Sequence, residues 1–245
     1  MSNAVAADPL KDCPVIITGA SSGIGRATAV RLARQGAALA LCGRSPSKLK
    51  ETLEMVAAAA QHARVFYRAF DITDDAEVRG FVHEAARELG SPRALVHCAG
   101  GNPARAAVAS AEPAMWDAQF ALNCRATASV ARACWPFWTL NGGGRCVVVV
   151  SSMALFSSEG NGPYAASKAA QRSLCDTLRK EGRGANVGVT AVYPGGVDTD
   201  FRPQARPEYM RADSVARAVE CALLLPPDAV MHEIVLRPPC EANFV

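Results

Sequence analysis

Apolar stretches of strand length alternate with stretches of helical periodicity along almost the whole chain. The strand-like stretches are residues 13–18, 37–43, 63–70, 93–98, 145–150, 187–193 and 232–238, and the helical ones are 24–35, 46–61, 74–89, 113–138, 164–181 and 213–225. Stretches such as Val147 to Val150 are apolar at every position, as in strands that helices cover on both faces. Repeated strand–helix–strand units build a parallel sheet between two helix layers. The sequence therefore predicts a doubly wound, Rossmann-type α/β fold of about seven strands in a single domain over residues 1–245.

Composition and charge narrow the class of partner. Of 245 residues, 50% are hydrophobic and 20% are charged, and the net charge is +3 with no run of lysines and arginines. We therefore expect no nucleic-acid partner. No apolar run reaches the roughly 18 residues that cross a membrane, so no membrane association is expected either. A small-molecule partner is the class that these numbers favour.

The cysteine pattern and the N-terminal residues indicate in which cellular compartment to expect the protein. There are nine cysteines, an odd number, with no CxxC pair. This pattern fits neither a disulfide framework nor a zinc site, so we expect reduced thiols and no metal. Residues 1–13 carry neither a signal-peptide pattern nor an arginine-rich amphipathic pattern, and the sequence predicts a cytoplasmic protein.

A glycine-rich turn follows the first predicted strand. It reads TGASSGIG from Thr18 to Gly25 and runs directly into a predicted helix. Glycines allow a positive φ and close approach of a phosphate to the backbone, and a helix N-terminus supplies free N–H groups. Because the spacing is GxxxGxG and not GxGxxG, a plain strand-to-helix turn remains the alternative. The residues expected to hold the phosphates are Gly19, Ser21, Ser22, Gly23, Ile24 and Gly25.

The end of the second strand predicts which dinucleotide binds. It reads Cys42-Gly43-Arg44-Ser45, with no carboxylate to hold the free ribose hydroxyls of NAD. Arg44 could instead pair with the 2′-phosphate of NADP, with Ser45 and Ser21 as further donors. We therefore expect NADP(H) to be preferred to NAD(H). A solvated arginine before a helix is the alternative.

Tyr164, Lys168 and a preceding serine form the candidate catalytic group. Tyr164 and Lys168 are four residues apart on a predicted helix, which puts them on one face. A tyrosine with a pKa of about 10 needs a nearby positive charge to act as an acid near neutrality. Ser151 ends the strand of residues 145–150, at the sheet edge where α/β proteins bind ligands. Ser152 is the alternative serine, and we favour Ser151.

Together these features resemble the short-chain dehydrogenase/reductase family in its non-extended form, over nearly the whole chain. The glycine turn, the Tyr-x-x-x-Lys pair, the acidic residue of Asp71-Ile72-Thr73, the helix asparagine Asn123 and the segment from Pro194 to Thr199 are similar to the family's motifs. One segment departs from the family pattern, since His97-Cys98-Ala99-Gly100 stands where the family usually has Asn-Asn-Ala-Gly. We interpret His97 as a core histidine and not as a catalytic one.

The resemblance implies a role for each of these residues. Tyr164 is the general acid/base, Lys168 binds the nicotinamide ribose and lowers the tyrosine pKa, Ser151 bonds the reacting carbonyl and Asn123 holds a water in the proton relay. The remaining residues that it implies at the cofactor are Asp71, Ile72, Cys98, Ala99, Gly100, Pro194, Gly195, Val197 and Thr199. The family also implies a homodimer or homotetramer.

The expected reaction moves a hydride between NADPH and a ketone, aldehyde or secondary alcohol. Two alternatives stay open, a pteridine or quinonoid reductase on the same fold and a catalytically silent NADPH-binding scaffold protein. Residues 200–212 are the one irregular stretch that could form a short substrate lid. Arg202, Arg206 and Arg211 in this stretch could attract an acidic substrate, but we favour a solvated loop.

Overall fold

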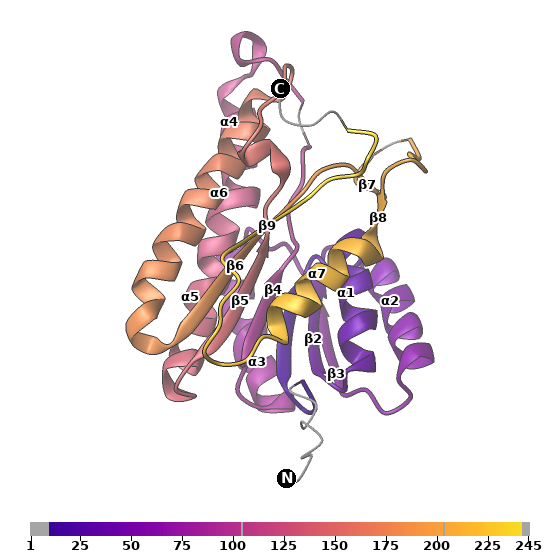
Figure 1. Cartoon of the computed structure of the whole chain (residues 1–245), viewed down its shortest axis with the longest axis vertical. Coiled ribbons are helices and arrows are strands. Elements are labelled where there is room, and N and C mark those ends of the chain that lie inside the picture. The colour runs from indigo at the N-terminus through magenta and orange to yellow at the C-terminus, as the bar shows by residue number, and fades with distance from the viewer. Residues whose placement is uncertain (1–9, 104, 203, 242–245) are drawn as a thin grey trace.

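A seven-stranded parallel sheet forms the centre of the protein (Figure 1). The computed structural model describes residues 10–103, 105–202 and 204–241. The strand order is β3-β2-β1-β4-β5-β6-β9, and every neighbouring pair is parallel. The strands are β1 (Pro14–Thr18), β2 (Ala38–Gly43), β3 (Val65–Ala69), β4 (Ala94–His97), β5 (Gly144–Val149), β6 (Val187–Pro194) and β9 (Glu233–Leu236). The predicted doubly wound fold of about seven strands is confirmed.

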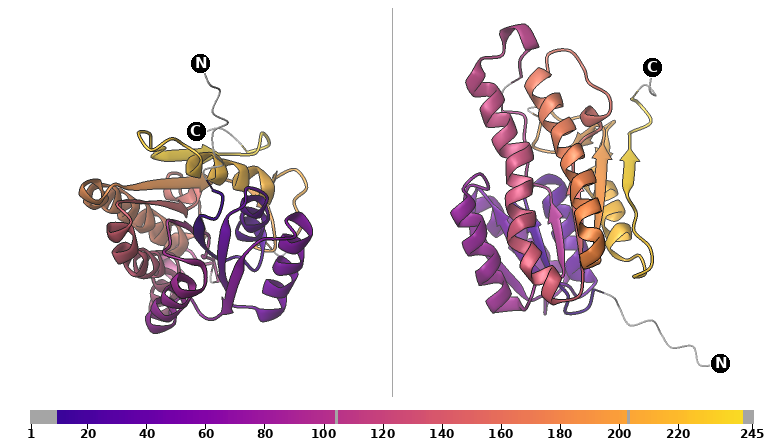
Figure 2. Two further views of the ribbon diagram at one scale, coloured as in Figure 1. Left: turned by 90° about the horizontal axis from the view of Figure 1, so that it is seen from below. Right: turned by 90° about the vertical axis from the view of Figure 1, so that its left-hand side faces the viewer.

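Helices cover both faces of the sheet (Figure 2). One layer contains α1 (Gly23–Arg34), α2 (Pro46–Ala59) and α7 (Ala212–Leu223), and the other contains α3 (Asp75–Leu89), α4 (Pro113–Phe120), α5 (Ala126–Leu140) and α6 (Gly162–Glu181). Successive strand residues face opposite layers, so that Ile16 packs in the α3 layer and Ile17 in the α1 layer. This is why the strands read as continuously apolar.

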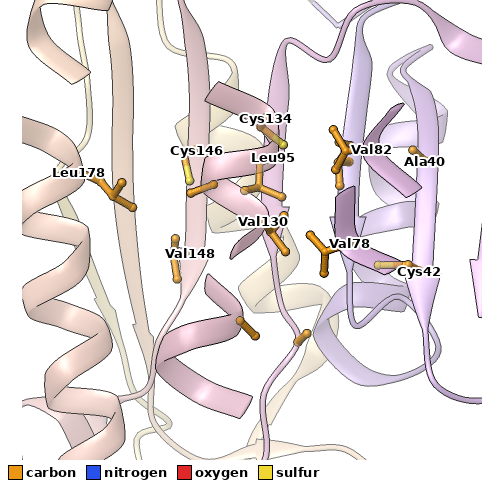
Figure 3. Close-up of a cluster of buried hydrophobic side chains, with 14 of the residues drawn as sticks. Ala40, Cys42, Val78, Val82, Leu95, Val130, Cys134, Cys146, Val148 and Leu178 are labelled. Carbon is orange, nitrogen blue, oxygen red and sulfur yellow. The ribbon is translucent and has the colours of Figure 1, made fainter. Parts of the chain in front are cut away.

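The core beneath α3, α5 and α6 is built from small and branched side chains (Figure 3). Val78 of α3, Val130 of α5 and Leu178 of α6 pack against the strands, and Cys134 and Cys146 lie among them. Each of these five side chains is at most 9% exposed. The cysteines here serve as small apolar side chains, and all nine in the chain are free thiols.

The helix predicted at 113–138 contains a π-helical turn. This turn, Ala121–Arg125, joins α4 to α5, which continues to Leu140. Such turns insert a residue into the helix and are frequent at functional sites. Asn123 lies in this turn, and hydrophobic periodicity alone does not reveal it.

Short elements outside the seven-stranded sheet complete the fold. Strands β7 (Val197–Asp198) and β8 (Met210–Arg211), which were not predicted, pair with each other in parallel. They fix both ends of the segment that contains most of the predicted lid. The 3-10 turns are Val108–Ser110, Ser152–Ala154 and Gly182–Ala185. Within the described residues, no helix combines the length and apolar character needed to cross a membrane.

Candidate active site

A cavity of about 820 Å³ opens at the carboxyl ends of the central strands. These strands run upward in the view of Figure 1. This volume is typical of small-molecule sites. The chain passes from β1 outward to β3 and returns to β4 on the other side of β1, which creates the crevice where α/β proteins bind ligands. The predicted site residues that line the cavity are Gly19, Ser21, Ser22, Gly23, Ile24, Gly25, Arg44, Ser45, Ile72, Cys98, Ala99, Gly100, Ser151, Tyr164, Lys168, Pro194, Gly195, Val197 and Thr199. Asp71 and Asn123 are not among the residues that line it.

The glycine turn requires glycine at its closest approaches to other loops. Gly19 has a φ of +65°, and a Cβ there would lie 2.8 Å from the backbone nitrogen of Ala99. Gly23 has a φ of +51° and faces Thr199, whose methyl group would lie 3.2 Å from an added Cβ. Ser22 precedes α1 without a side-chain cap. The first amides of α1 are therefore left to an anion in the cavity, which fits a dinucleotide phosphate.

Arg26 supports the glycine turn from outside the cavity. Its guanidinium donates to the Ser21 carbonyl at 2.6 Å, to Glu51 at 2.8 Å and to the Thr52 hydroxyl at 3.0 Å. Thr52 in turn donates to the Ala20 carbonyl at 2.9 Å. These bonds tie the turn to α2. Sequence reasoning missed Arg26, since an arginine in the first turn of a helix gives no distinctive signal.

The end of β2 presents a positive charge to the cavity. Arg44 is exposed and makes no hydrogen bond or salt bridge with any described residue. Ser45 caps α2, because its hydroxyl accepts from the Lys48 amide at 3.3 Å. Asp71 instead accepts from both the amide and the hydroxyl of Thr73 at 2.9 Å. The carboxylate of Asp71 is thus held in its own turn.

Tyr164, Ser151 and Lys168 meet at one end of the cavity. Tyr164 lies in the first turn of α6, and the Lys168 ammonium is 5.9 Å from the centre of its ring. The Ser151 side chain acts on the phenol of Tyr164 and lowers its pKa, and it accepts from the Met153 amide at 3.2 Å. The Phe201 ring lies 6.1 Å from the Tyr164 ring, between centroids. Both Ser151 and Ser152 line the cavity, and the effect on the Tyr164 pKa distinguishes Ser151.

Burial dominates the titration of both catalytic candidates. It raises the pKa of Tyr164, and the hydrogen bond with Ser151 and the charges of Arg202 and Arg105 oppose part of that rise. Burial lowers the pKa of Lys168 to about 7. The expectation that Lys168 lowers the tyrosine pKa stays a prediction for the enzyme with its cofactor bound. The Lys168 ammonium donates to Gln171, and desolvation of the phenol outweighs the opposing charges.

Asn123 lies behind the cavity wall, fully buried. Its Oδ1 accepts from the Gly101 amide, and its Nδ2 donates to the Gly101 carbonyl, each at 2.9 Å. Its Nδ2 also donates to the Ser167 hydroxyl at 3.0 Å, and Ser167 donates to the Tyr164 carbonyl at 2.8 Å. The Asn123 side chain thus ties the loop after β4 to the start of α6. The backbone carbonyl of Asn123 accepts from the Thr127 hydroxyl at 3.1 Å.

His97 is enclosed in the sheet and does not line the cavity. Its Nδ1 lies 2.9 Å from the Thr18 hydroxyl, which also accepts from the Ala99 amide at 3.1 Å. Its Nε2 has no hydrogen-bond partner within the described part of the chain. Burial lowers the pKa of His97 to about 3, so the imidazole is neutral. Thr18, which was not among the predicted site residues, connects His97 to the loop that approaches Gly19.

One protein-family model covers most of the chain. The family model described as "short chain dehydrogenase" matches residues 14–210. The chain belongs to the short-chain dehydrogenase/reductase family. The predicted resemblance is therefore confirmed, and the chain is an oxidoreductase with a nucleotide-binding fold.

Individual members of the family resemble the chain over most of its length. It is 31% identical to the glycine betaine reductase ATRR of Emericella nidulans over 243 residues, a match that covers 94% of this chain and 19% of that protein. An alcohol dehydrogenase from the archaeon Thermococcus sibiricus, complexed with 5-hydroxy-NADP, is 27% identical with a TM-score of 0.86, covering 95% and 99% of the two chains. A short chain dehydrogenase from Mycobacterium paratuberculosis bound to NAD is 25% identical with a TM-score of 0.84, covering 93% and 97%.

Proposed function

We propose that the protein is an NADP(H)-dependent dehydrogenase/reductase that interconverts a ketone or aldehyde and its alcohol. The observation that carries this proposal is the meeting of Ser151, Tyr164 and Lys168 in the cavity that the glycine turn also lines. A hydroxyl, a phenol and an ammonium beside a phosphate seat fit proton transfer next to a bound dinucleotide. The likeness to an alcohol dehydrogenase complexed with 5-hydroxy-NADP supports the proposal.

The preference for NADP(H) rests on the end of β2. Arg44 lines the cavity without an ion-pair partner among the described residues, and no carboxylate follows the strand. A free guanidinium fits a 2′-phosphate, whereas ribose hydroxyls would call for an acceptor. Solved relatives carry either an NADP analogue or NAD. In this chain, Arg44 is the residue that favours NADP(H).

Each residue has a defined task in the proposed reaction. The nicotinamide ring, when bound, supplies the hydride to the carbonyl carbon or accepts it from the alcohol. Tyr164, kept protonated at neutral pH by its raised pKa, donates its proton to the carbonyl oxygen in reduction. Ser151 hydrogen-bonds that oxygen as negative charge develops on it. Lys168 places a positive charge near the phenol in its charged form.

A turnover screen tests the proposal. Purified protein and NADPH are offered ketones and aldehydes, with a pteridine and a quinone in parallel. Oxidation of NADPH with a ketone or aldehyde, and its loss in Tyr164→Phe, are expected. Turnover of the pteridine or quinone alone would indicate a ring reductase. Tight NADPH binding without oxidation across the whole panel would indicate a silent scaffold protein.

A further inference from the structure

Two arginines from different loops line the cavity at its tyrosine end. Arg105 lies in the loop after β4, and Arg202 lies in the loop after β7. Their charges act on the phenol of Tyr164 and lower its pKa against the effect of burial. Neither guanidinium forms a salt bridge with any described residue. The catalytic end of the cavity therefore carries positive charge without a counterion from the described chain.

Of the other charged side chains that line the cavity, Lys48, Asp200 and Glu241 have charged partners, Lys168 belongs to the proposed catalytic group, and Arg44 lies at the end of β2. Lys48 pairs with Asp200 at 2.7 Å. Glu241 accepts from Arg237 at 3.0 Å and from the Gly196 amide at 2.8 Å, so its carboxylate is already satisfied. The Lys168 ammonium donates to the Gln171 side chain at 2.9 Å. At the tyrosine end of the cavity, Arg105 and Arg202 are thus the two arginines that have no ion-pair partner among the described residues and can bind an anionic ligand.

The structure also distinguishes the arginines of the predicted lid. Arg206 pairs with Glu208 at 3.5 Å and does not line the cavity, and neither does Arg211. Arg202 lies over the Tyr209 ring, 5.0 Å from its centre, which restricts where its guanidinium can go. The preceding residue, Phe201, packs on Tyr164. The solvated-loop interpretation fits Arg206 and Arg211 but not Arg202.

We propose that the substrate is a small carbonyl compound with an anionic group, whose anion is bound by Arg105 and Arg202 while its carbonyl faces Tyr164. Guanidinium groups are suited to such groups because their planar donors match two oxygens of a carboxylate or phosphate. The inference rests on the proposed function, since it names the substrate class of that same site. Keto acids are its simplest members, and phosphorylated carbonyl compounds share the same recognition chemistry.

Matched substrates test the charge requirement. Pyruvate is compared with methyl pyruvate, acetoacetate with methyl acetoacetate, and dihydroxyacetone phosphate with dihydroxyacetone, all with NADPH. We expect kcat/KM for at least one anionic member to exceed that of its neutral partner by about 10-fold or more, the effect of one charge-assisted hydrogen bond. The carboxylate and phosphate pairs distinguish the two anion types. Neutral members that react as well as their anionic partners would overturn the inference and leave the proposed function intact.

Arginine variants test the assignment of residues. Arg105→Gln and Arg202→Gln should each lower kcat/KM for the anionic substrate by about 10-fold and change that of the neutral one by less than about 3-fold. Arg206→Gln, in the same loop but paired with Glu208, is the matched control and should change neither. Equal losses on both substrates would contradict the inference. So would a weakened affinity for NADPH in the Arg105 and Arg202 variants, which would place these side chains on the cofactor.

A binding measurement covers the case in which no carbonyl compound is turned over. The proposed function would then be wrong, and calorimetric titration of NADP-loaded protein with the three anions tests the anion site separately. Binding that is lost in the Arg105→Gln, Arg202→Gln double variant would support the site. Absence of binding, or binding unchanged in the double variant, would overturn it.

Discussion

The ammonium of Lys168 donates a hydrogen bond to Oε1 of Gln171 at 2.9 Å, one turn further along α6. Gln171 is fully buried, and its Nε2 donates to the Thr127 hydroxyl at 2.8 Å. That second bond keeps the amide oxygen directed at the lysine. Because burial lowers the pKa of Lys168 to about 7, an acceptor on the ammonium helps to keep it charged near neutrality.

Substitutions of Gln171 should therefore move the pH profile of carbonyl reduction. Removing the acceptor in Gln171→Leu disfavours the ammonium and should lower the pH at which activity falls on the alkaline side by about one unit. Gln171→Glu places a carboxylate there and should raise that pH. Steady-state kcat/KM from pH 5 to 10 measures both shifts. Identical midpoints in the two variants and the wild type would show that Gln171 has only a structural role.

His97 should make the protein less stable in acid. Its pKa is lowered to about 3 by burial, whereas the unfolded residue titrates near 6.5. Above pH 6.5 the imidazole is neutral in both states, and below it the unfolded state alone gains a proton, so stability falls as the pH falls toward 3. From pH 7 to 5 this contribution is about 2 kcal/mol. Urea unfolding of wild type and His97→Asn at both pH values should reveal it, and a constant difference between the two proteins would contradict it.

The adjacent serines should differ in their effect on catalysis. The Ser151 hydroxyl lowers the pKa of Tyr164, whereas Ser152 begins the following 3-10 turn. Ser151→Ala removes a hydrogen bond to the developing charge and should raise the barrier by about 2 to 4 kcal/mol. Ser152→Ala should stay within a few-fold of wild type in kcat. The opposite ranking in steady-state kinetics would assign the role to Ser152.

Arg44→Glu should reverse or abolish the preference for NADPH. The substitution replaces a partner of the 2′-phosphate with a carboxylate that repels it and can accept from ribose hydroxyls. Fluorescence titration with NADPH and NADH gives the two dissociation constants for wild type and variant. Equal affinities of the wild type for NADPH and NADH, or an equal loss of both affinities in the variant, would mean that Arg44 does not bind the 2′-phosphate.

The sheet could be predicted from sequence because its strands are buried on both faces and therefore apolar throughout. The two-residue pair β7–β8 has no such pattern, since each strand is too short for periodicity to appear. The π-helical turn at Asn123 was also missed, because a single inserted residue hardly disturbs hydrophobic spacing.

The candidate site was located through local motifs, and its remote contacts were not. The residues within the glycine turn are close in sequence, and so are Tyr164 and Lys168, so spacing alone predicts each motif. Arg105 and Arg202 lie in separate loops, and only the folded chain brings both to Tyr164. The contact of Gln171 with Lys168 could have been predicted, because a polar residue three positions after Lys168 shares its helix face.

Transfer of deuterium from NADPH deuterated at the reactive nicotinamide carbon shows directly whether the protein moves a hydride to a carbonyl carbon. The proposed reaction predicts that wild-type protein places the label on the carbonyl carbon of a ketone or aldehyde. It also predicts that Tyr164→Phe, which keeps the ring and loses the phenolic proton, binds NADPH normally and transfers the label at least about 100-fold more slowly. Label transfer by Tyr164→Phe at the wild-type rate, or no transfer by wild-type protein to any carbonyl substrate, would contradict it.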